Sequence, residues 1–171
     1  MKTVYLLRHA KSSWTDQEAA DFDRRLAPRG RDAARAMAAH MKAAGMDPAL
    51  VLCSAARRTT ETWSLMARTL GPTAKVKRLR TLYLAAPGRI LTLVRRLPDG
   101  AGDALIIGHN PGMHDVALRL AGQGEDKAMR RLQAKFPTGA LAVLRFDAAR
   151  WRDIAEQAGT LAAFVRPKDL A

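Results

Sequence analysis

Two arginines and two histidines follow strand-like apolar runs in this sequence. Arg8 and His9 directly follow "YLL" near the start of the chain, Arg58 lies just beyond "ALVLC", and His109 directly follows "DALIIG". Guanidinium groups bind phosphate oxygens through paired N–H donors, and a neutral imidazole can attack phosphorus as a nucleophile. These side-chain types therefore predict a site that binds and transfers a phosphoryl group.

The elements that must position these residues alternate between strand and helix. We expect strands over residues 3–8, 49–53, 75–79, 103–108, 140–146 and 161–165. We expect helices over about 29–44, 55–70 (ending at Gly71-Pro72), 87–97, and from Pro111 to about Ala121-Gly122. Short apolar strands between helices predict an α/β fold, a three-layer α/β/α sandwich with a mostly parallel central sheet. The length favours one domain over residues 1–171.

Ligands of such sheets bind beyond the carboxyl ends of the strands, where all three runs place their charged residues. Helix N-termini there would add amide donors and a positive dipole end for an anion. Ser54 is the expected N-cap of the second helix, which puts Arg58 near its first turn. Asn110 is the expected N-cap of a later helix, with Pro111 as its first residue. Ser12 and Asn110 are further candidate substrate contacts.

Composition narrows the function classes. The chain has 171 residues, 48% hydrophobic and 26% charged, with a net charge of +13. Such a charge favours anionic partners, or it is only a basic surface. Aromatic residues make up 5%, too few for obvious base-stacking platforms, so we expect no specific nucleic acid. The sequence shows no membrane-spanning run and no signal peptide, and its one cysteine, Cys53, fits a reducing compartment. We therefore expect a cytoplasmic protein without a membrane partner.

Three motifs together resemble the histidine phosphatase superfamily, which has the phosphoglycerate mutase-like fold. "LLRHAKSSW" resembles its R-H-G/A motif, with Ala10 where many members have glycine. "SAARRTTET" resembles its S-x-x-x-R-x-x-x-T segment, with Ser54, Arg58 and Thr62 in register, and "IIGHNPG" resembles its second-histidine motif. The small size, "DRRLAPRGRDAA" and "PTGALAVLRFD" are similar to SixA-type phosphohistidine phosphatases.

This resemblance implies a role for each motif residue. His9 would be the nucleophile, transiently phosphorylated, while Arg8, Arg58 and His109 would bind the phosphoryl oxygens and stabilise the transition state. The resemblance implies no metal and no cofactor. The implied activity is hydrolysis of phosphohistidine in a protein, such as a histidine phosphotransfer protein; a small phosphorylated molecule is the other candidate substrate.

The sequence does not identify a general acid. The acidic candidates are Asp16, Glu18, Asp21, Asp23 and Glu61. A phosphohistidine needs little help from an acid, because a protonated imidazole leaves readily. A missing acid would therefore favour phosphoramidate substrates over phosphate esters.

Alternative functions remain at this stage. They are a small-molecule phosphomonoesterase on the same fold and a non-catalytic module that binds anions or nucleic acid. A cysteine phosphatase is disfavoured, because Cys53 and Arg58 are separated by four residues rather than five, with no glycine between them.

Overall fold

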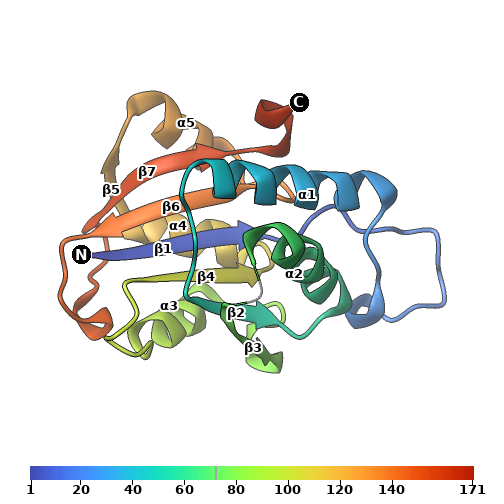
Figure 1. Ribbon diagram of the computed structural model, residues 1–171, viewed down its shortest axis with the longest axis horizontal. Helices are drawn as coiled ribbons and strands as arrows, with labels where there is room; N and C mark the ends of the chain where they lie inside the picture. The colour runs from blue at the N-terminus through green and yellow to red at the C-terminus, as the bar shows by residue number, and fades with distance from the viewer. Residues whose placement is uncertain (72) are drawn as a thin grey trace.

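Seven β-strands form one sheet in the order β3-β2-β4-β1-β6-β7-β5 (Figure 1). The computed structural model describes residues 1–71 and 73–171. The strands are β1 (Lys2–Arg8), β2 (Leu50–Ser54), β3 (Lys75–Leu79), β4 (Asp103–Gly108), β5 (Ala121–Gly124), β6 (Leu141–Phe146) and β7 (Gly159–Val165). β3, β2, β4 and β1 are parallel, β6 is antiparallel to β1 and β7, and β5 is parallel to β7. The sheet is mixed and mostly parallel, as predicted.

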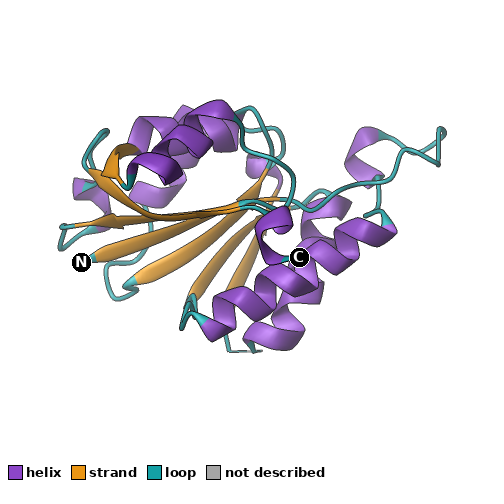
Figure 2. Cartoon of the chain, turned by 90° about the horizontal axis from the view of Figure 1, so that it is seen from above, coloured by secondary structure: helices purple, strands orange, loops and turns teal. Residues whose placement is uncertain are grey.

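Helices cover both faces of this sheet, which gives three layers (Figure 2). They are α1 (Pro28–Ala43), α2 (Arg57–Leu70), α3 (Pro87–Arg95), α4 (Gly112–Leu120) and α5 (Asp126–Ala134). Successive side chains of a strand point to opposite faces, so β1 contributes to two cores. Tyr5 and Leu7 pack with residues of α1 and α2, whereas Val4 and Leu6 pack with residues of α3, α4 and α5. The predicted α/β/α sandwich is confirmed.

The predicted elements that flank the motifs occur within a few residues of their expected bounds. The second helix starts at Arg57 and ends at Leu70, where Gly71 follows with a φ of 101° that favours glycine. Pro72, which the sequence predicts to help end this helix, lies outside the described residues.

Sequence patterns do not predict β5 and α5. β5 has the sequence AGQG, which lacks apolar alternation. Four of the nine residues of α5 are charged, and Leu132 is its one buried residue. In a helix with so few buried residues, apolar side chains do not recur clearly at helical spacing, so the sequence does not indicate the helix.

The chain between β1 and α1 projects beyond the carboxyl ends of the parallel strands (Figures 1 and 2). It contains the short helical turn η1 (Asp21–Asp23), and an isolated bridge between Ser12 and Leu26 joins its two sides. A second such turn, η2 (Arg80–Leu82), follows β3. These two segments supply side chains to the site. No helix among the described residues is long and apolar enough to cross a bilayer.

Candidate active site

The two predicted histidines lie side by side because β1 and β4 are adjacent strands. Arg8, the last residue of β1, is in register with Gly108, the last residue of β4. The next backbone N–H, that of His9, donates to the Gly108 carbonyl at 3.1 Å. The rings of His9 and His109 are consequently close, with centroids 5.3 Å apart. The structure thus brings the first and third motifs to one edge of the sheet.

Arg58 reaches the same place from the first turn of α2. Its Nε–H donates to Nε2 of His9 at 3.3 Å, and its side chain is buried. Ser54 ends β2 and bonds to His109, with 2.7 Å between Ser54 Oγ and His109 Nε2. The expectation that Ser54 is the N-cap is wrong: Ala56 holds that position, and Ser54 Oγ accepts the Ala56 N–H at 3.3 Å.

Backbone contacts fix the orientation of His9. Its Nδ1 lies 2.7 Å from the carbonyl oxygen of Ala10. A carbonyl only accepts, so Nδ1 carries the proton and Nε2 of the neutral ring keeps its lone pair. The Ala10 N–H donates to Thr62 Oγ1 at 3.1 Å, and the Thr62 hydroxyl donates to the Arg58 carbonyl at 2.7 Å. Thr62 of the second motif therefore links the loop after β1, which contains His9 and Ala10 (the histidine loop), to helix α2, which contains Arg58.

The tautomer of His109 follows from Ser54. Among the described residues, the Ser54 hydroxyl has no other acceptor, so it donates to Nε2 of His109. Nδ1 of the neutral ring then carries the proton, and this buried atom has no partner among the described residues. It is available to donate to an incoming oxygen.

Both histidines are held neutral. His9 is 5% exposed and His109 is 2% exposed. Burial, followed by positive charge from Arg58 and Arg8, lowers the pKa of each ring from 6.5 to about 3, and His109 adds to the effect on His9. Burial disfavours the charged form of an imidazole, and so do nearby cations. Neutral rings are the form that can attack phosphorus.

Arg8 is held by the segment that precedes β6. Its Nη1 donates to the Phe136 carbonyl at 3.1 Å, whereas its buried Nε has no partner in the described part of the chain. Burial, and then repulsion from Arg58, lowers the pKa of Arg8. An anion bound next to both guanidinium groups would relieve this repulsion.

Asn110 does not cap α4. Its side-chain amide donates to the same Phe136 carbonyl at 2.9 Å, which turns it away from the helix. The helix instead begins at Gly112 with Pro111 at the N-cap position, so both cap expectations in this motif are wrong. This bond uses one of the two amide N–H groups, and the buried Oδ1 has no partner among the described residues, so contact of Asn110 with a substrate stays a prediction.

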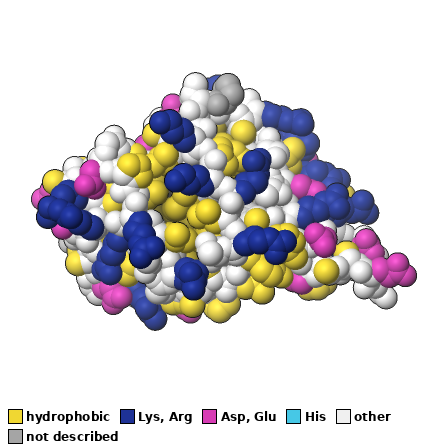
Figure 3. All heavy atoms as spheres, turned by 90° about the horizontal axis from the view of Figure 1, so that it is seen from below, with side chains coloured by type: hydrophobic (Ala, Val, Ile, Leu, Met, Phe, Trp, Pro, Cys, Tyr) yellow, Lys and Arg dark blue, Asp and Glu magenta, His cyan; other side chains and the backbone are white. Residues whose placement is uncertain are grey.

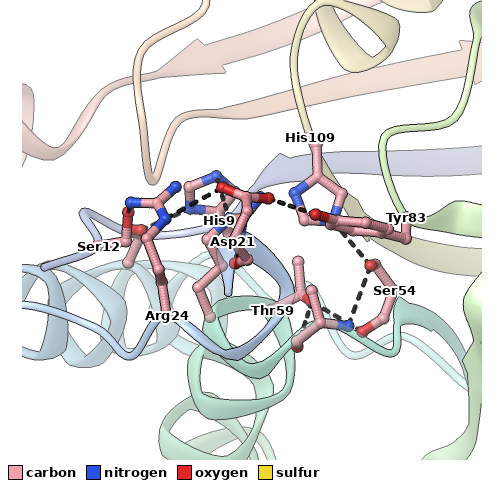
Figure 4. Close-up of polar contacts among 11 residues, drawn as sticks. His9, Ser12, Asp21, Arg24, Ser54, Thr59, Tyr83 and His109 are labelled. Atoms are coloured by element: carbon pink, nitrogen blue, oxygen red, sulfur yellow. Dashed lines mark hydrogen bonds and ion pairs between the residues drawn. The ribbon is translucent and has the colours of Figure 1, made fainter. Parts of the chain in front are cut away.

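An acidic side chain covers the arginine of the site. Oδ2 of Asp21 accepts from Nη2 of Arg58 at 3.1 Å and from the hydroxyl of Tyr83, and Oδ1 accepts from Nε of Arg24 at 3.1 Å. In Figure 4, Asp21 lies between Arg24 and Tyr83, close to His9. The hydrogen bond from Tyr83, and then the charge of Arg58, lowers the pKa of Asp21 to about 2. Asp21 is therefore ionised at neutral pH, although its side chain is 44% exposed.

Sequence reasoning missed Arg24 and Tyr83. Arg24 is buried, and its Nη1 donates to Ser12 Oγ at 2.7 Å. The hydroxyl of Ser12, a candidate substrate contact, is therefore bonded to a guanidinium group. Tyr83 follows η2 and lies edge-on to His109, with ring centroids 5.4 Å apart. Arg24 lies in the segment "DRRLAPRGRDAA", which gave no role to a single residue, Tyr83 lies in none of the quoted motifs, and both reach the site through irregular segments.

Two of the other acidic candidates, Glu61 and Asp16, bond to groups outside the site. Glu61 accepts the Leu26 N–H and pairs with Arg57, both at 2.8 Å. Asp16 accepts the backbone N–H of Glu18 at 3.2 Å, and Asp23 lines a separate hollow in the projecting loop. Of the five candidates, Asp21 alone contacts Arg58 among the described residues.

The structure also argues against a thiolate nucleophile. Cys53 is buried at the end of β2. Burial raises the pKa of its thiol to about 12, so the thiol stays protonated at neutral pH. A thiol in this form does not attack phosphorus readily.

Comparison with known proteins agrees with this geometry. Residues 4–85 match the family model of the histidine phosphatase superfamily (branch 1). An uncharacterised protein of Mycobacterium leprae is 36% identical over 166 residues, which cover 95% of this chain and 100% of that protein.

Two solved structures, each provisionally assigned as the phosphohistidine phosphatase SixA, superpose on 97% of this chain. The one from Nakamurella multipartitia has a TM-score of 0.84 at 28% identity over 96% of its chain. The one from Agrobacterium tumefaciens has a TM-score of 0.82 at 29% identity over 98% of its chain. The chain belongs to the histidine phosphatase superfamily. Within it, the chain is a phosphatase with the fold of these SixA structures.

Proposed function

We propose that the protein is a metal-independent phosphohistidine phosphatase, formed by a single domain over residues 1–171. Its substrate would be phosphohistidine in a protein, such as a histidine phosphotransfer protein. The assignments of the two SixA structures support the substrate class. The positive charge that the reaction needs comes from Arg8 and Arg58, so the proposal requires no metal.

One observation carries this proposal: Nε2 of His9 is unprotonated, and its lone pair accepts the Arg58 Nε–H at 3.3 Å, a bond that must open when the nitrogen attacks phosphorus. A phosphoryl group bound to that guanidinium would stand directly before the nucleophilic nitrogen. The same guanidinium now donates from Nη2 to the carboxylate of Asp21, so it can bind an anionic oxygen. The substrate phosphoryl group would displace Asp21 from Arg58.

The remaining donors would hold the phosphoryl oxygens. Nε of Arg8 and Nδ1 of His109 are buried atoms without a partner among the described residues. An unpaired buried donor costs free energy, on the order of 1–3 kcal/mol each, which a bound anion would offset. Donors that are fixed in advance cost no reorganisation when charge develops in the transition state.

The reaction would run in two displacements. In the first, the Nε2 lone pair of His9 attacks phosphorus. The substrate P–N bond breaks, and its electron pair returns to the imidazole of the substrate. In the second, water attacks the phosphorus of phospho-His9, the P–Nε2 bond breaks with its pair returning to Nε2, and the water gives one proton to solvent. The products are histidine and inorganic phosphate.

The state of Asp21 favours phosphohistidine over alkyl phosphates. An alkoxide leaving group needs a proton from a general acid, and in the free protein the carboxyl group of Asp21, with a pKa of about 2, holds no proton at neutral pH. A protonated phosphohistidine ring leaves without that help. A phosphomonoesterase of alkyl esters is accordingly the weaker alternative.

The test compares wild type, His9→Ala and His40→Ala. His40 lies on α1, so its removal controls for the loss of one histidine outside the site. Each protein is incubated with a histidine-phosphorylated protein, free phosphohistidine and an alkyl phosphate, and phosphate release is followed by 31P NMR. Wild type and His40→Ala should hydrolyse both phosphohistidines at equal rates, and His9→Ala should be slower by at least about a thousand-fold.

A base-stable, acid-labile phosphoryl group should also appear on wild type and be absent from His9→Ala. Equal release of phosphate by wild type and His9→Ala would overturn the proposal. Faster release from the alkyl phosphate than from either phosphohistidine would support the phosphomonoesterase instead.

A further inference from the structure

A strongly basic groove of about 500 Å³ lies between α5 and the C-terminal turn η4 (Pro167–Leu170). We call it the α5–η4 groove. Six cationic residues line it: Lys127, Arg130, Arg131, Lys135, Arg166 and Lys168. No acidic residue is among the described residues that line it.

Most of this charge is not neutralised by the protein. Within residues 1–71 and 73–171, Lys127, Arg130, Lys135 and Lys168 form no ion pair. The carboxylate of the neighbouring Asp169 forms ion pairs with the other two cations, at 2.7 Å from Arg166 and 3.9 Å from Arg131. A surface that concentrates unpaired cations in one hollow attracts anionic partners.

The groove and the candidate active site share one short segment. Pro137 and Thr138 line the groove. The preceding carbonyl, that of Phe136, accepts from Arg8, and the following N–H, that of Gly139, donates to the carbonyl of His9 at 2.9 Å. A chain that lies in the groove therefore passes beside the backbone that holds the nucleophile.

The net charge of the molecule does not by itself single out this groove. Lys and Arg are also spread over the opposite face, where they alternate with apolar and acidic side chains (Figure 3). The α5–η4 groove differs from that face because six cations line it and it adjoins the site, whereas three cations line a hollow near β3 and α3. The opposite face supplies exposed cations for a control.

We propose that the α5–η4 groove docks an acidic segment of the phosphorylated protein substrate. The proposal rests on the proposed function, and it adds that the substrate carries Asp or Glu residues near its phosphohistidine. Charge complementarity supports a polypeptide carboxylate as the occupant. Single-stranded nucleic acid is the weaker reading, because no aromatic side chain is among the described lining residues to stack on a base.

The experiment uses two charge-matched triple variants of the full chain. The groove variant carries Arg130→Glu, Lys135→Glu and Lys168→Glu. The control variant carries Lys75→Glu, Lys77→Glu and Arg96→Glu, which reverse three exposed cations near β3 and α3. The substrates are free phosphohistidine and two phosphohistidine peptides that differ only in having glutamates or serines around the phosphohistidine.

Wild type and the control variant should turn over the glutamate peptide about ten-fold more efficiently than the serine peptide, through a lower KM, with the difference fading at high salt. The groove variant should lose this preference and keep wild-type activity on free phosphohistidine. A groove variant that keeps the preference, or a control variant that loses it equally, would overturn the docking site.

Binding of the unphosphorylated glutamate peptide, followed by fluorescence anisotropy, separates docking from catalysis. Weaker binding by the groove variant than by the control variant supports the docking site even if no protein releases phosphate, in which case only the proposed function fails. Absence of binding to wild type would overturn the docking site while leaving the proposed function intact. A single-stranded RNA that outcompetes the peptide from the groove would also overturn it, in favour of nucleic acid.

Discussion

Both site histidines should stay uncharged when the pH is lowered from about 8 to about 5. His9 and His109 are buried next to arginines, and burial is the main reason that the pKa of each ring is lowered from 6.5 to about 3. At pH 5 an imidazole with a pKa of 6.5 is about 3% neutral, whereas one with a pKa near 3 is about 99% neutral. The reactive form of an ordinary histidine would thus fall about thirty-fold, while that of His9 would hardly change.

The same pKa values give the stability a definite pH dependence. Each folded-state pKa lies below the unfolded value of 6.5, so the unfolded chain binds protons first as the pH falls. The stabilisation is fully present above pH 6.5 and is lost progressively towards pH 3. By pH 5 each buried ring should have lost about 2 kcal/mol of folding free energy.

The assay is an NMR titration of the imidazole carbon-bound protons, with the two site rings assigned from spectra of His9→Gln and His109→Gln. Their shifts should stay constant from pH 8 to pH 5, and binding of inorganic phosphate should raise both pKa values because an anion stabilises the charged rings. A midpoint between pH 6 and pH 7 for either ring in the free protein would refute the reasoning from burial and charge.

Three further predictions concern the residues around the site. Cys53→Ser should leave phosphatase activity within about two-fold of wild type in a steady-state assay, because a buried thiol with a pKa of about 12 takes no part in the reaction; an inactive variant would revive the thiolate mechanism. Thr62→Val should cost about 1–3 kcal/mol in urea denaturation and lower activity, because the Ala10 N–H loses its acceptor, and Thr62→Ser should restore most of both. Gly30→Ala should destabilise the protein by about 1–3 kcal/mol, since the added Cβ would lie 2.0 Å from a backbone carbonyl of the histidine loop, whereas Gly88→Ala, with open space around it, should be tolerated; equal denaturation midpoints for the two variants would contradict this packing argument.

The sequence contains most of what is needed to predict the fold and the meeting of the four motif residues. Continuous apolar runs before His9 and His109 indicate buried strands, and parallel strands end at one edge of a sheet. His9 and His109 can meet only if their strands are neighbours, and β1 and β4 are paired in the structure. The local sequence pattern was sufficient here because each residue ends its strand, follows it directly, or lies in the first turn of the next helix.

The side chains that lie over the four motif residues could not be predicted in the same way. Asp21, Arg24 and Tyr83 lie on irregular segments, and their positions depend on how those segments fold over the sheet edge. Spacing rules apply to helices and strands and do not extend to such loops. The wrong N-cap expectations for Ser54 and Asn110 have a related cause, because tertiary partners compete for side chains that local sequence assigns to a helix end.

The position of β1 between β4 and β6 has a consequence for hydrogen exchange. Both edges of β1 are paired, so the backbone amide hydrogens of Val4 to Leu7 should exchange with solvent only through opening of the whole sheet. The chain around Asp21 is largely exposed and should exchange quickly. The molecule thus joins a slow-exchanging strand, which ends one residue before His9, to a fast-exchanging rim, and in the proposed reaction that rim would open each time an anion reaches the histidine.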